Sequence, residues 1–203
     1  MFKKMNLPNK LTILRIALIP LFIIALCLPK EWIWPLWTGL GIYLVAAITD
    51  FVDGAIARKT NSITKFGKIM DPLADKLLVS AGFVMLTGFG IIPAWITALI
   101  IFRDFFVNAF RMFGAEKETD LAASLSGKIK TVFQLIGIPL ALLNLAMGVA
   151  GVGAFFTTAI NMSVFELMVN VAMSVSIFAA VAATVWSFID YFIRFKKDID
   201  IEN

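Results

Sequence analysis

The chain has 203 residues, of which 60% are hydrophobic and 13% aromatic, and a formal net charge of +4 at pH 7. It contains no histidine and one cysteine, Cys27, which excludes zinc chemistry, histidine-based catalytic triads and an internal disulfide. Its apolar runs are long enough to cross a bilayer, and the basic excess fits membrane topology better than nucleic-acid binding. We therefore expect an integral membrane protein without a nucleic-acid partner.

The N-terminal region is a basic segment followed by an apolar run, Leu11–Leu28. A secretory signal peptide has the same outline, but Arg15 interrupts this run and no small-residue cleavage site follows it. We interpret the run as the first membrane span. Arg15 lies about a turn or more inside the membrane face, where the sequence leaves two alternatives open: contact with a phosphate group, or snorkelling to the interface.

The second and third spans carry the acidic residues. A tryptophan-rich connector, Pro29–Pro35, predicts an interfacial anchor, and the second span follows at about Leu36–Ala57. A loop covers Arg58–Met70, and Asp71 with Pro72 is expected to open the third span, because proline is tolerated in a first helical turn. This arrangement brings the acids of both spans to one membrane level.

Four aspartates form two pairs on these spans, Asp50 with Asp53 and Asp71 with Asp75. Spacings of three and four residues place each pair on one helix face. An aspartate within a membrane costs about 2.5–3.5 kcal/mol, so four together need a cation. Oxygen-only ligands favour Mg²⁺ or Mn²⁺, and we expect two ions. The structural alternative is a set of helix-end carboxylates paired with loop lysines.

A turn near Gly88–Pro93 separates the third span from the fourth, at about Ala94–Phe113. The fourth span has a polar stripe on one face, formed by Asp104, Asn108 and Arg111. Arg103 and Asp104 are expected to lock helices together, because buried membrane charges commonly pair. Arg111 lies nearer the membrane face of the acidic residues, where a functional role is favoured.

The C-terminal part provides two further spans. A polar loop, Gly114–Gly127, precedes the fifth, which begins at Lys128, and the uncharged stretch Gly148–Ser163 is read as a helix end with an outer loop. The sixth span is expected over Val164–Phe195, with a disordered tail at Lys196–Asn203. Six spans result, in one domain covering residues 1–203, and the fold is an all-α membrane bundle.

Lysine and arginine distribution predicts the orientation. Outside the spans these residues lie almost entirely in the even-numbered loops and at the two termini. The positive-inside rule therefore places both termini and the acidic cluster on the cytoplasmic side of a multi-pass protein in the cell membrane.

The acidic region also carries a recognisable pattern of fixed residues: Asp50, Asp53, Gly54, Ala57, Arg58, Gly67, Asp71 and Asp75. These positions and their spacing resemble the signature of the CDP-alcohol phosphatidyltransferases. A similar Pro-Asn-x-Leu-Thr-x-x-Arg segment, Pro8 to Arg15, begins many members. The resemblance implies a bacterial enzyme that transfers a phosphatidyl group from CDP-diacylglycerol to an alcohol and releases CMP.

The resemblance also implies residue roles. The four aspartates would bind the metal ions, and Asp75 would be the general base. The groups that would bind CDP-diacylglycerol are Asp53, Gly54, Ala57, Arg58, Gly67 and Asp71. A homodimer in the membrane is expected by the same analogy.

Glycerol 3-phosphate is the acceptor that the basic residues favour. The start of the fifth span resembles the glycerol-phosphate-using branch of the family, as does Arg103-Asp104 with Arg111. The expected acceptor-phosphate site consists of Arg111, Lys128, Lys130, Thr131 and Gln134. A basic helix start at the cytoplasmic interface is the alternative explanation for the lysines.

Other functions remain open at this stage. The acceptor could be serine, inositol phosphate or phosphatidylglycerol, of which serine would leave the basic groups without a role. A divalent-cation transporter also places carboxylates in a membrane, but these acids lie at one face and Arg58 would repel cations. An aspartate-rich prenyl-transferring enzyme is disfavoured by Gly54 and the Ala57-Arg58 pair.

Overall fold

The chain folds into a bundle of long helices. The computed structural model describes residues 7–28, 34–60, 65–116, 125–148 and 163–201. Side chains are described in these ranges except at 7–8, 51–60, 65–66, 68–69, 72, 109–116, 125–126, 128 and 194–201. Within the described ranges the elements are α1 (Leu7–Cys27), α2 (Trp34–Thr60), α3 (Lys65–Gly88), α4 (Ala94–Glu116), α5 (Leu125–Ala146) and α7 (Val164–Ile201). The all-α prediction is confirmed.

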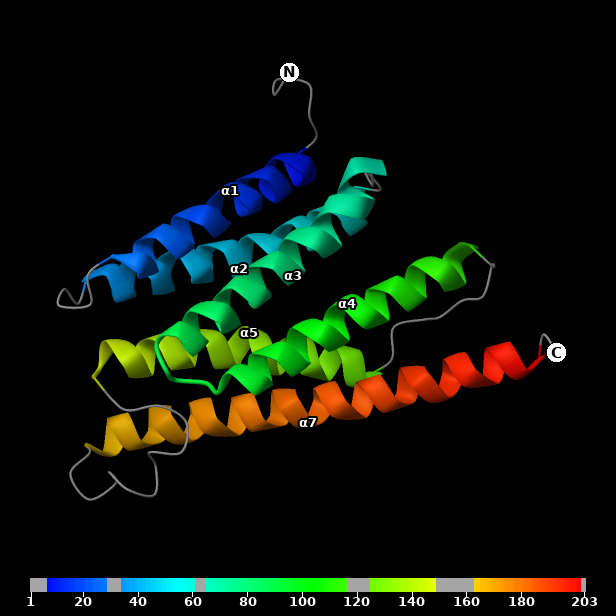
Figure 1. Cartoon of the computed structure of the whole chain (residues 1–203). Helices are drawn as coiled ribbons and strands as arrows, with labels where there is room; N and C mark the ends of the chain where they lie inside the picture. Colours follow the sequence, from blue (N-terminus) through cyan, green and yellow to red (C-terminus); the bar gives the residue numbers. More distant parts are fainter. Residues whose placement is uncertain (1–6, 29–33, 61–64, 117–124, 149–162, 202–203) are drawn as a thin grey trace.

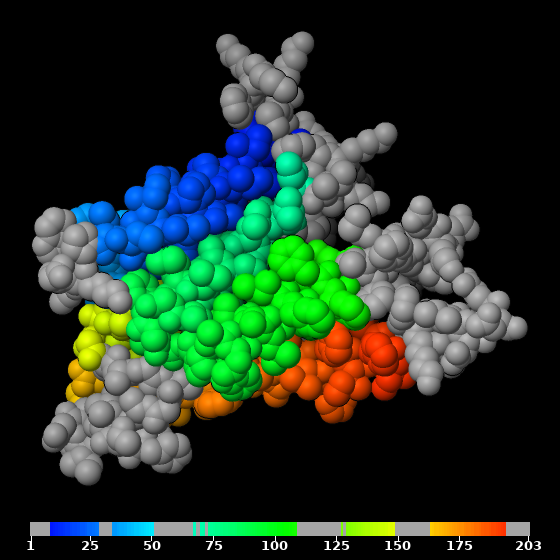
Figure 2. Space-filling view, in the orientation of Figure 1, coloured from blue at the N-terminus to red at the C-terminus, as the bar shows by residue number. Residues whose placement is uncertain are grey.

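The helices form two groups that pack against each other. In the first, α1 lies along α2 and also contacts α3; in the second, α5 and α7 share the most extensive interface and α4 packs on α7. The groups meet where α2 and α3 contact α5 and where α3 contacts α4. Figure 1 shows that α1 begins, α2 ends, α3 begins and α7 ends at the same end of the bundle. Figure 2 shows α1, α3, α4 and α7 following one another across one face.

Close helix packing depends on apolar side chains and on two glycines. The rings of Phe22 in α1 and Tyr43 in α2 lie 5.7 Å apart, and both side chains are fully buried. A Cβ atom added at Gly82 would lie 2.9 Å from Ile138, and one at Gly39 would lie 2.5 Å from the Leu26 side chain. Absent side chains therefore set how closely α3 approaches α5 and α2 approaches α1.

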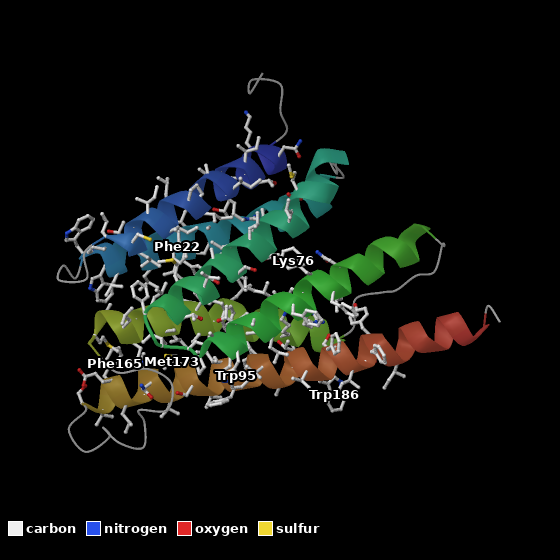
Figure 3. All side chains as sticks on the ribbon, viewed as in Figure 1. Phe22, Lys76, Trp95, Phe165, Met173 and Trp186 are labelled. Atoms are coloured by element: carbon white, nitrogen blue, oxygen red, sulfur yellow. The ribbon has the colours of Figure 1, made fainter. Side chains whose placement is uncertain are left out.

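The outer surface of the bundle is apolar, as a membrane environment requires. Exposed large hydrophobic side chains occur on every described helix, among them Ile24, Ile48, Val84, Phe105, Ile136 and Trp186. In Figure 3 the Trp186 side chain points away from the bundle. Three helices contain spans long and apolar enough to cross a bilayer: Asn9–Cys27, Ile129–Ala146 and Val164–Ile193. The chain is a membrane protein, and the number of spans stays a prediction.

The predicted boundaries differ most from the structure in two places, and the other helix ends differ by smaller amounts. The helix α3 begins at Lys65, six residues before Asp71, so Pro72 lies inside the helix and not in its first turn. The backbone there forgoes one hydrogen bond, since proline lacks an N–H. The second difference is that α7 continues to Ile201, whereas the sequence predicted disorder from Lys196. The prediction rested on the end of the apolar stretch, and the helix extends beyond it.

The turn predicted at Gly88–Pro93 is confirmed. The Gly90 amide donates to the Thr87 carbonyl at 2.9 Å, and Gly90 has a φ of 74°, a left-handed conformation that glycine adopts without steric cost. The expected outer loop lies mostly outside the described residues, as does most of the polar loop between α4 and α5.

Candidate active site

The structure brings the acidic residues of α2 and α3 together. Asp50 lies three turns before the end of α2, and Asp71 and Asp75 lie in the second and third turns of α3. The carboxylates of Asp71 and Asp50 lie close enough to repel each other electrostatically, and so do those of Asp50 and Asp75. All three side chains are half-buried. Because like charges repel at this range, the arrangement requires positive charge nearby.

Helix α1 supplies the positive charge and a hydroxyl group. Nη1 of Arg15 lies 2.5 Å from Oδ1 of Asp50, and the Arg15 side chain is fully buried. One turn earlier, the hydroxyl of Thr12 donates to Oδ1 of Asp71 at 2.5 Å. Arg15 therefore turns inward to a carboxylate of the motif, an arrangement that neither sequence-based alternative described.

The donor chemistry fits a hard divalent cation. Among the residues with described side chains, no three acidic groups stand close enough together to hold a metal ion. The fourth predicted ligand, Asp53, lies in α2 where side chains are not described. The described part of the site still has three carboxylates, of which Asp50 pairs with Arg15 and Asp71 accepts from Thr12. Oxygen donors with excess negative charge are what Mg²⁺ and Mn²⁺ bind.

The residues expected to bind the nucleotide lie beside these acids along the chain. Four of them, Asp53, Gly54, Ala57 and Arg58, occupy the last two turns of α2, where only the backbone is described. Gly67 is buried in the first turn of α3, one turn before Asp71. The structure thus places all of the predicted motif positions on the ends of two helices, α2 and α3, that contact each other.

A second polar cluster links α4, α5 and α7. The carboxylate of Asp104 in α4 accepts from Lys130 in α5, and it accepts from Arg103 at 3.2 Å. Arg103 also donates to Ser187 in α7, and its guanidinium lies 5.8 Å from the ring centroid of Tyr191. All five side chains are buried. This network matches the helix-locking role expected of Arg103 and Asp104.

Three of the five predicted acceptor residues have described side chains. Lys130 is engaged in the ion pair with Asp104. The Thr131 hydroxyl donates to the Gly127 carbonyl at 3.1 Å, within its own helix. Gln134 is buried, and its amide nitrogen finds no hydrogen-bond acceptor in the part of the chain that the structure describes.

The other two acceptor candidates, Arg111 and Lys128, have no described side chains. Their backbones lie in the last two turns of α4 and the first turn of α5. Figure 1 shows both of these helix ends at the end of the bundle where α2 ends and α3 begins.

The acidic site and the buried network are electrostatic neighbours. Asp104 lies close enough to repel Asp75 electrostatically. Lys76 attracts the carboxylate of Asp75 and repels the ammonium group of Lys130. Figure 3 shows the Lys76 side chain extending from α3 toward α4. The site can therefore combine excess negative charge on one side with excess positive charge on the other, which suits a metal-assisted reaction between phosphate-bearing molecules.

Sequence reasoning missed two residues that belong to the acidic site. Thr12 lies three residues before Arg15, so both share one face of α1, and this spacing was the available signal. Tyr43 lies seven residues before Asp50 on α2. Its hydroxyl is buried within electrostatic range of the Asp75 carboxylate. An i, i+7 relation to an acid indicates a shared helix face, but apolar neighbours made Tyr43 look like ordinary core.

Comparison with known proteins gives a consistent result. The family model described as CDP-alcohol phosphatidyltransferase matches residues 5–186. This range includes the acidic residues of α2 and α3, the contacts from α1 and the Arg103, Asp104 and Lys130 side chains of the buried network, whereas Ser187 and Tyr191 lie just beyond it.

Three similar relatives share the name CDP-diacylglycerol–glycerol-3-phosphate 3-phosphatidyltransferase. The protein from Bacillus subtilis (strain 168) is 44% identical over 149 residues, which cover 68% of this chain and 77% of that protein. Those from Salmonella paratyphi A and Escherichia coli (strain K12) are 38% identical over 162 residues, covering 76% of this chain and 87% of each relative.

Proposed function

This chain belongs to the CDP-alcohol phosphatidyltransferase family, and from that premise we propose that it transfers the phosphatidyl group of CDP-diacylglycerol to glycerol 3-phosphate. The products are phosphatidylglycerophosphate and CMP, in phospholipid biosynthesis. The observation that carries the proposal is the approach of Asp50, Asp71 and Asp75 from two helices, with Asp75 within electrostatic range of Asp104, the carboxylate that pairs with the buried Lys130. The names of the relatives supply the acceptor.

The reaction exchanges a phosphoanhydride bond of the donor for a phosphoester bond to the acceptor. A hydroxyl oxygen of the acceptor attacks the phosphorus that carries diacylglycerol, and the bond from that phosphorus to the CMP oxygen breaks. We assign Asp75 as the group that takes the hydroxyl proton, because it lies one turn beyond Asp71 on α3 and faces both the acids and the basic network. A positioned general base of this kind contributes roughly 10²–10⁴-fold to a rate.

A divalent metal cofactor fits the acidic side of the site. Asp50, Asp53, Asp71 and Asp75 would hold Mg²⁺ or Mn²⁺, two ions in our proposal, and the bound metal would neutralise the charge that develops on the departing CMP. The nucleotide itself would lie against the ends of α2 and α3. There Gly54, Ala57 and the buried Gly67 leave room close to the backbone, and Arg58 would donate to phosphate.

The basic side of the site supports an acceptor that carries its own phosphate. The network holds two cations, Arg103 and Lys130, around the single carboxylate of Asp104. Arg111 and Lys128 add positive charge on the neighbouring ends of α4 and α5. A phosphate dianion is stabilised by such an excess, whereas serine, which lacks a phosphate, would leave it without a ligand.

For the membrane arrangement we propose six spans with both termini and the active site facing the cytoplasm of a bacterium, and a homodimer. Figure 1 shows that α1 begins and α7 ends at the same end of the bundle, where α2 ends and α3 begins. This arrangement supports placing both termini and the acidic residues on one side of the membrane. A site at the cytoplasmic end of the spans suits a lipid-anchored donor and a water-soluble acceptor, since both reach that depth.

The test is CMP release by the purified protein in detergent with CDP-diacylglycerol and Mg²⁺. Release with glycerol 3-phosphate, and not with serine, inositol phosphate or phosphatidylglycerol, is the expected result. Activity should vanish in EDTA and return with added Mg²⁺ or Mn²⁺. Release with serine alone would replace the proposed acceptor, and no release with any acceptor from folded protein would reject the proposal.

A further inference from the structure

Helix α1 reaches two different acids of the site from one of its faces. Thr12 and Arg15 are three residues apart, so their side chains project in the same direction. Thr12 contacts Asp71 on α3 and Arg15 contacts Asp50 on α2. Both α1 side chains are almost completely buried, at 1% and 0% exposure. One short segment of α1 therefore fixes carboxylates that belong to two separate helices.

The burial of Arg15 makes this contact more than a surface ion pair. A guanidinium with no exposed surface loses its hydration and is tolerated only with a counter-charge. Asp50 provides that charge at 2.5 Å, and the charge of Arg15 also acts on Asp75. Arg15 is thus the buried cation that offsets the mutual repulsion of Asp50 and Asp75, with Lys76 adding positive charge beside Asp75.

Both contacts are compatible with metal ligation by the same carboxylates. Each uses the Oδ1 atom of its aspartate, and an ionised carboxylate offers two oxygens with about four acceptor positions. Groups that hydrogen-bond to ligating carboxylates orient them, and losing such a group typically lowers metal affinity about 10–100-fold. The contacts of Thr12 with Asp71 and of Arg15 with Asp50 are of this kind.

We propose that Thr12 and Arg15 are positioning residues: α1 holds Asp71 and Asp50 in the orientation that binds the divalent metal, and Arg15 keeps the acidic site assembled when no metal is present. The inference rests on the proposed function, because it assumes that these aspartates ligate a metal ion. Neither residue touches the reacting atoms in this account.

The test measures Mn²⁺ affinity of the full-length protein in detergent, without substrates, by the electron paramagnetic resonance signal of free Mn²⁺. Arg15→Met and Thr12→Val should each raise the Mn²⁺ dissociation constant at least about tenfold. Thr12→Ser retains the hydroxyl and should bind within about twofold of wild type. Arg15→Lys keeps a charge without the planar fork, so it should recover only part of the loss.

A matched control comes from Thr87 in α3, whose hydroxyl lies 2.6 Å from the hydroxyl of Thr97 in α4, at the opposite end of α3 from the acids. Thr87→Val removes a hydroxyl in the same way as Thr12→Val and should leave Mn²⁺ affinity unchanged. A general loss of stability would affect both variants, whereas loss of a positioning contact affects Thr12→Val alone.

The melting temperature in EDTA gives a second readout. Arg15→Met should melt lower than wild type in EDTA and should regain more of its stability than wild type when Mn²⁺ is added at saturation. If Arg15→Met does not fold, the comparison of Thr12→Val with Thr12→Ser still decides the inference.

Two results would overturn it. Folded Arg15→Met and Thr12→Val proteins that bind Mn²⁺ within about twofold of wild type would show that α1 positions nothing. Tighter Mn²⁺ binding by Arg15→Met would show that Arg15 competes with the metal. If wild type releases CMP with glycerol 3-phosphate in either case, the proposed function survives and the inference alone fails. Wild type that neither binds Mn²⁺ nor releases CMP rejects both.

Discussion

The acidic site and the buried network of α4, α5 and α7 solve the same electrostatic problem in opposite ways. In the acidic site the guanidinium of Arg15 pairs with Asp50 and lies within electrostatic range of Asp75, while Asp71 accepts from the Thr12 hydroxyl. In the network two cations surround the one carboxylate of Asp104. Each cluster is buried or half-buried inside an apolar bundle. Among the side chains that the structure describes, the acidic site has more carboxylates than cations and the network has more cations than carboxylates.

The sign of the excess charge indicates which kind of ligand each cluster would stabilise. A balanced ion pair inside a membrane protein needs no ligand, whereas an excess of one sign is stabilised only by something of the other sign. The acidic site is suited to a cation and the network to an anion. Because the charge of Asp104 also acts on Asp75, a metal ion and a phosphate group would occupy adjacent positions.

The largest effect that tests this comparison is expected for Asp75→Asn. Removing the proposed general base should lower kcat by roughly 10²–10⁴-fold, measured as CMP release with glycerol 3-phosphate. The melting temperature should not fall, because the change removes one of three mutually repelling charges. A variant that kept more than a tenth of wild-type kcat would show that the base lies elsewhere.

Unlike Asp75→Asn, which should lower activity without lowering stability, Asp104→Asn should cause a large loss of stability. The substitution keeps the shape of the side chain but leaves Arg103 and Lys130 buried without their counter-charge. Breaking a buried pair in this way costs about 3–5 kcal/mol, which thermal unfolding in detergent would detect as a markedly lower melting temperature.

The matched control for Asp104→Asn is Glu166→Gln at the start of α7. Its half-exposed carboxylate accepts from the Ser163 amide at 2.8 Å, so its loss should cost no more than about 1 kcal/mol. Equal destabilisation by the two variants would contradict the view that the network locks the helices.

Lys130→Met tests whether the positive excess serves the acceptor. Arg103 would still neutralise Asp104 in this variant, so the protein should fold, but the phosphate would lose one nearby cation. We expect the KM for glycerol 3-phosphate to rise about tenfold, equivalent to about 1.4 kcal/mol, with a smaller change in kcat. An unchanged KM together with a lowered melting temperature would assign Lys130 to the network alone.

The helices, and the positions of the aspartates on two of them, could be predicted from the sequence because these features are local. Apolar runs, the turn at Gly90 and the three- and four-residue spacings of the aspartates are all readable along the chain. The extension of α3 back to Lys65 was not readable, since Pro72 suggested a first turn and the basic residues before it suggested a loop.

The tertiary partners of the charged side chains were beyond local reasoning. The contact of Arg15 with Asp50 spans α1 and α2, and that of Lys130 with Asp104 spans α4 and α5. Helix periodicity shows which residues share a face but not which face another helix covers. The helix-locking role of Arg103 and Asp104 was expected because buried membrane charges commonly pair, whereas Thr12 gave no sign of a charged partner.

The smallest expected effect comes from a region that belongs to neither charged cluster. The hydroxyl groups of Thr87 and Thr97 lie 2.6 Å apart where α3 meets α4, and Thr97 is buried. Thr87→Val preserves side-chain volume but removes this contact and the hydrogen bond that Thr87 donates to the Phe83 carbonyl at 3.0 Å within α3. A threonine bond to the carbonyl four residues earlier adds little to helix stability, so the unfolding free energy should fall by about 0.5–1.5 kcal/mol. Activity should remain at the wild-type level, because no charge of either cluster changes. A loss of CMP release in a Thr87→Val protein that melts near the wild-type temperature would show that the α3–α4 contact transmits strain to Asp75, and the two clusters could then not be treated as separate from the packing beside them.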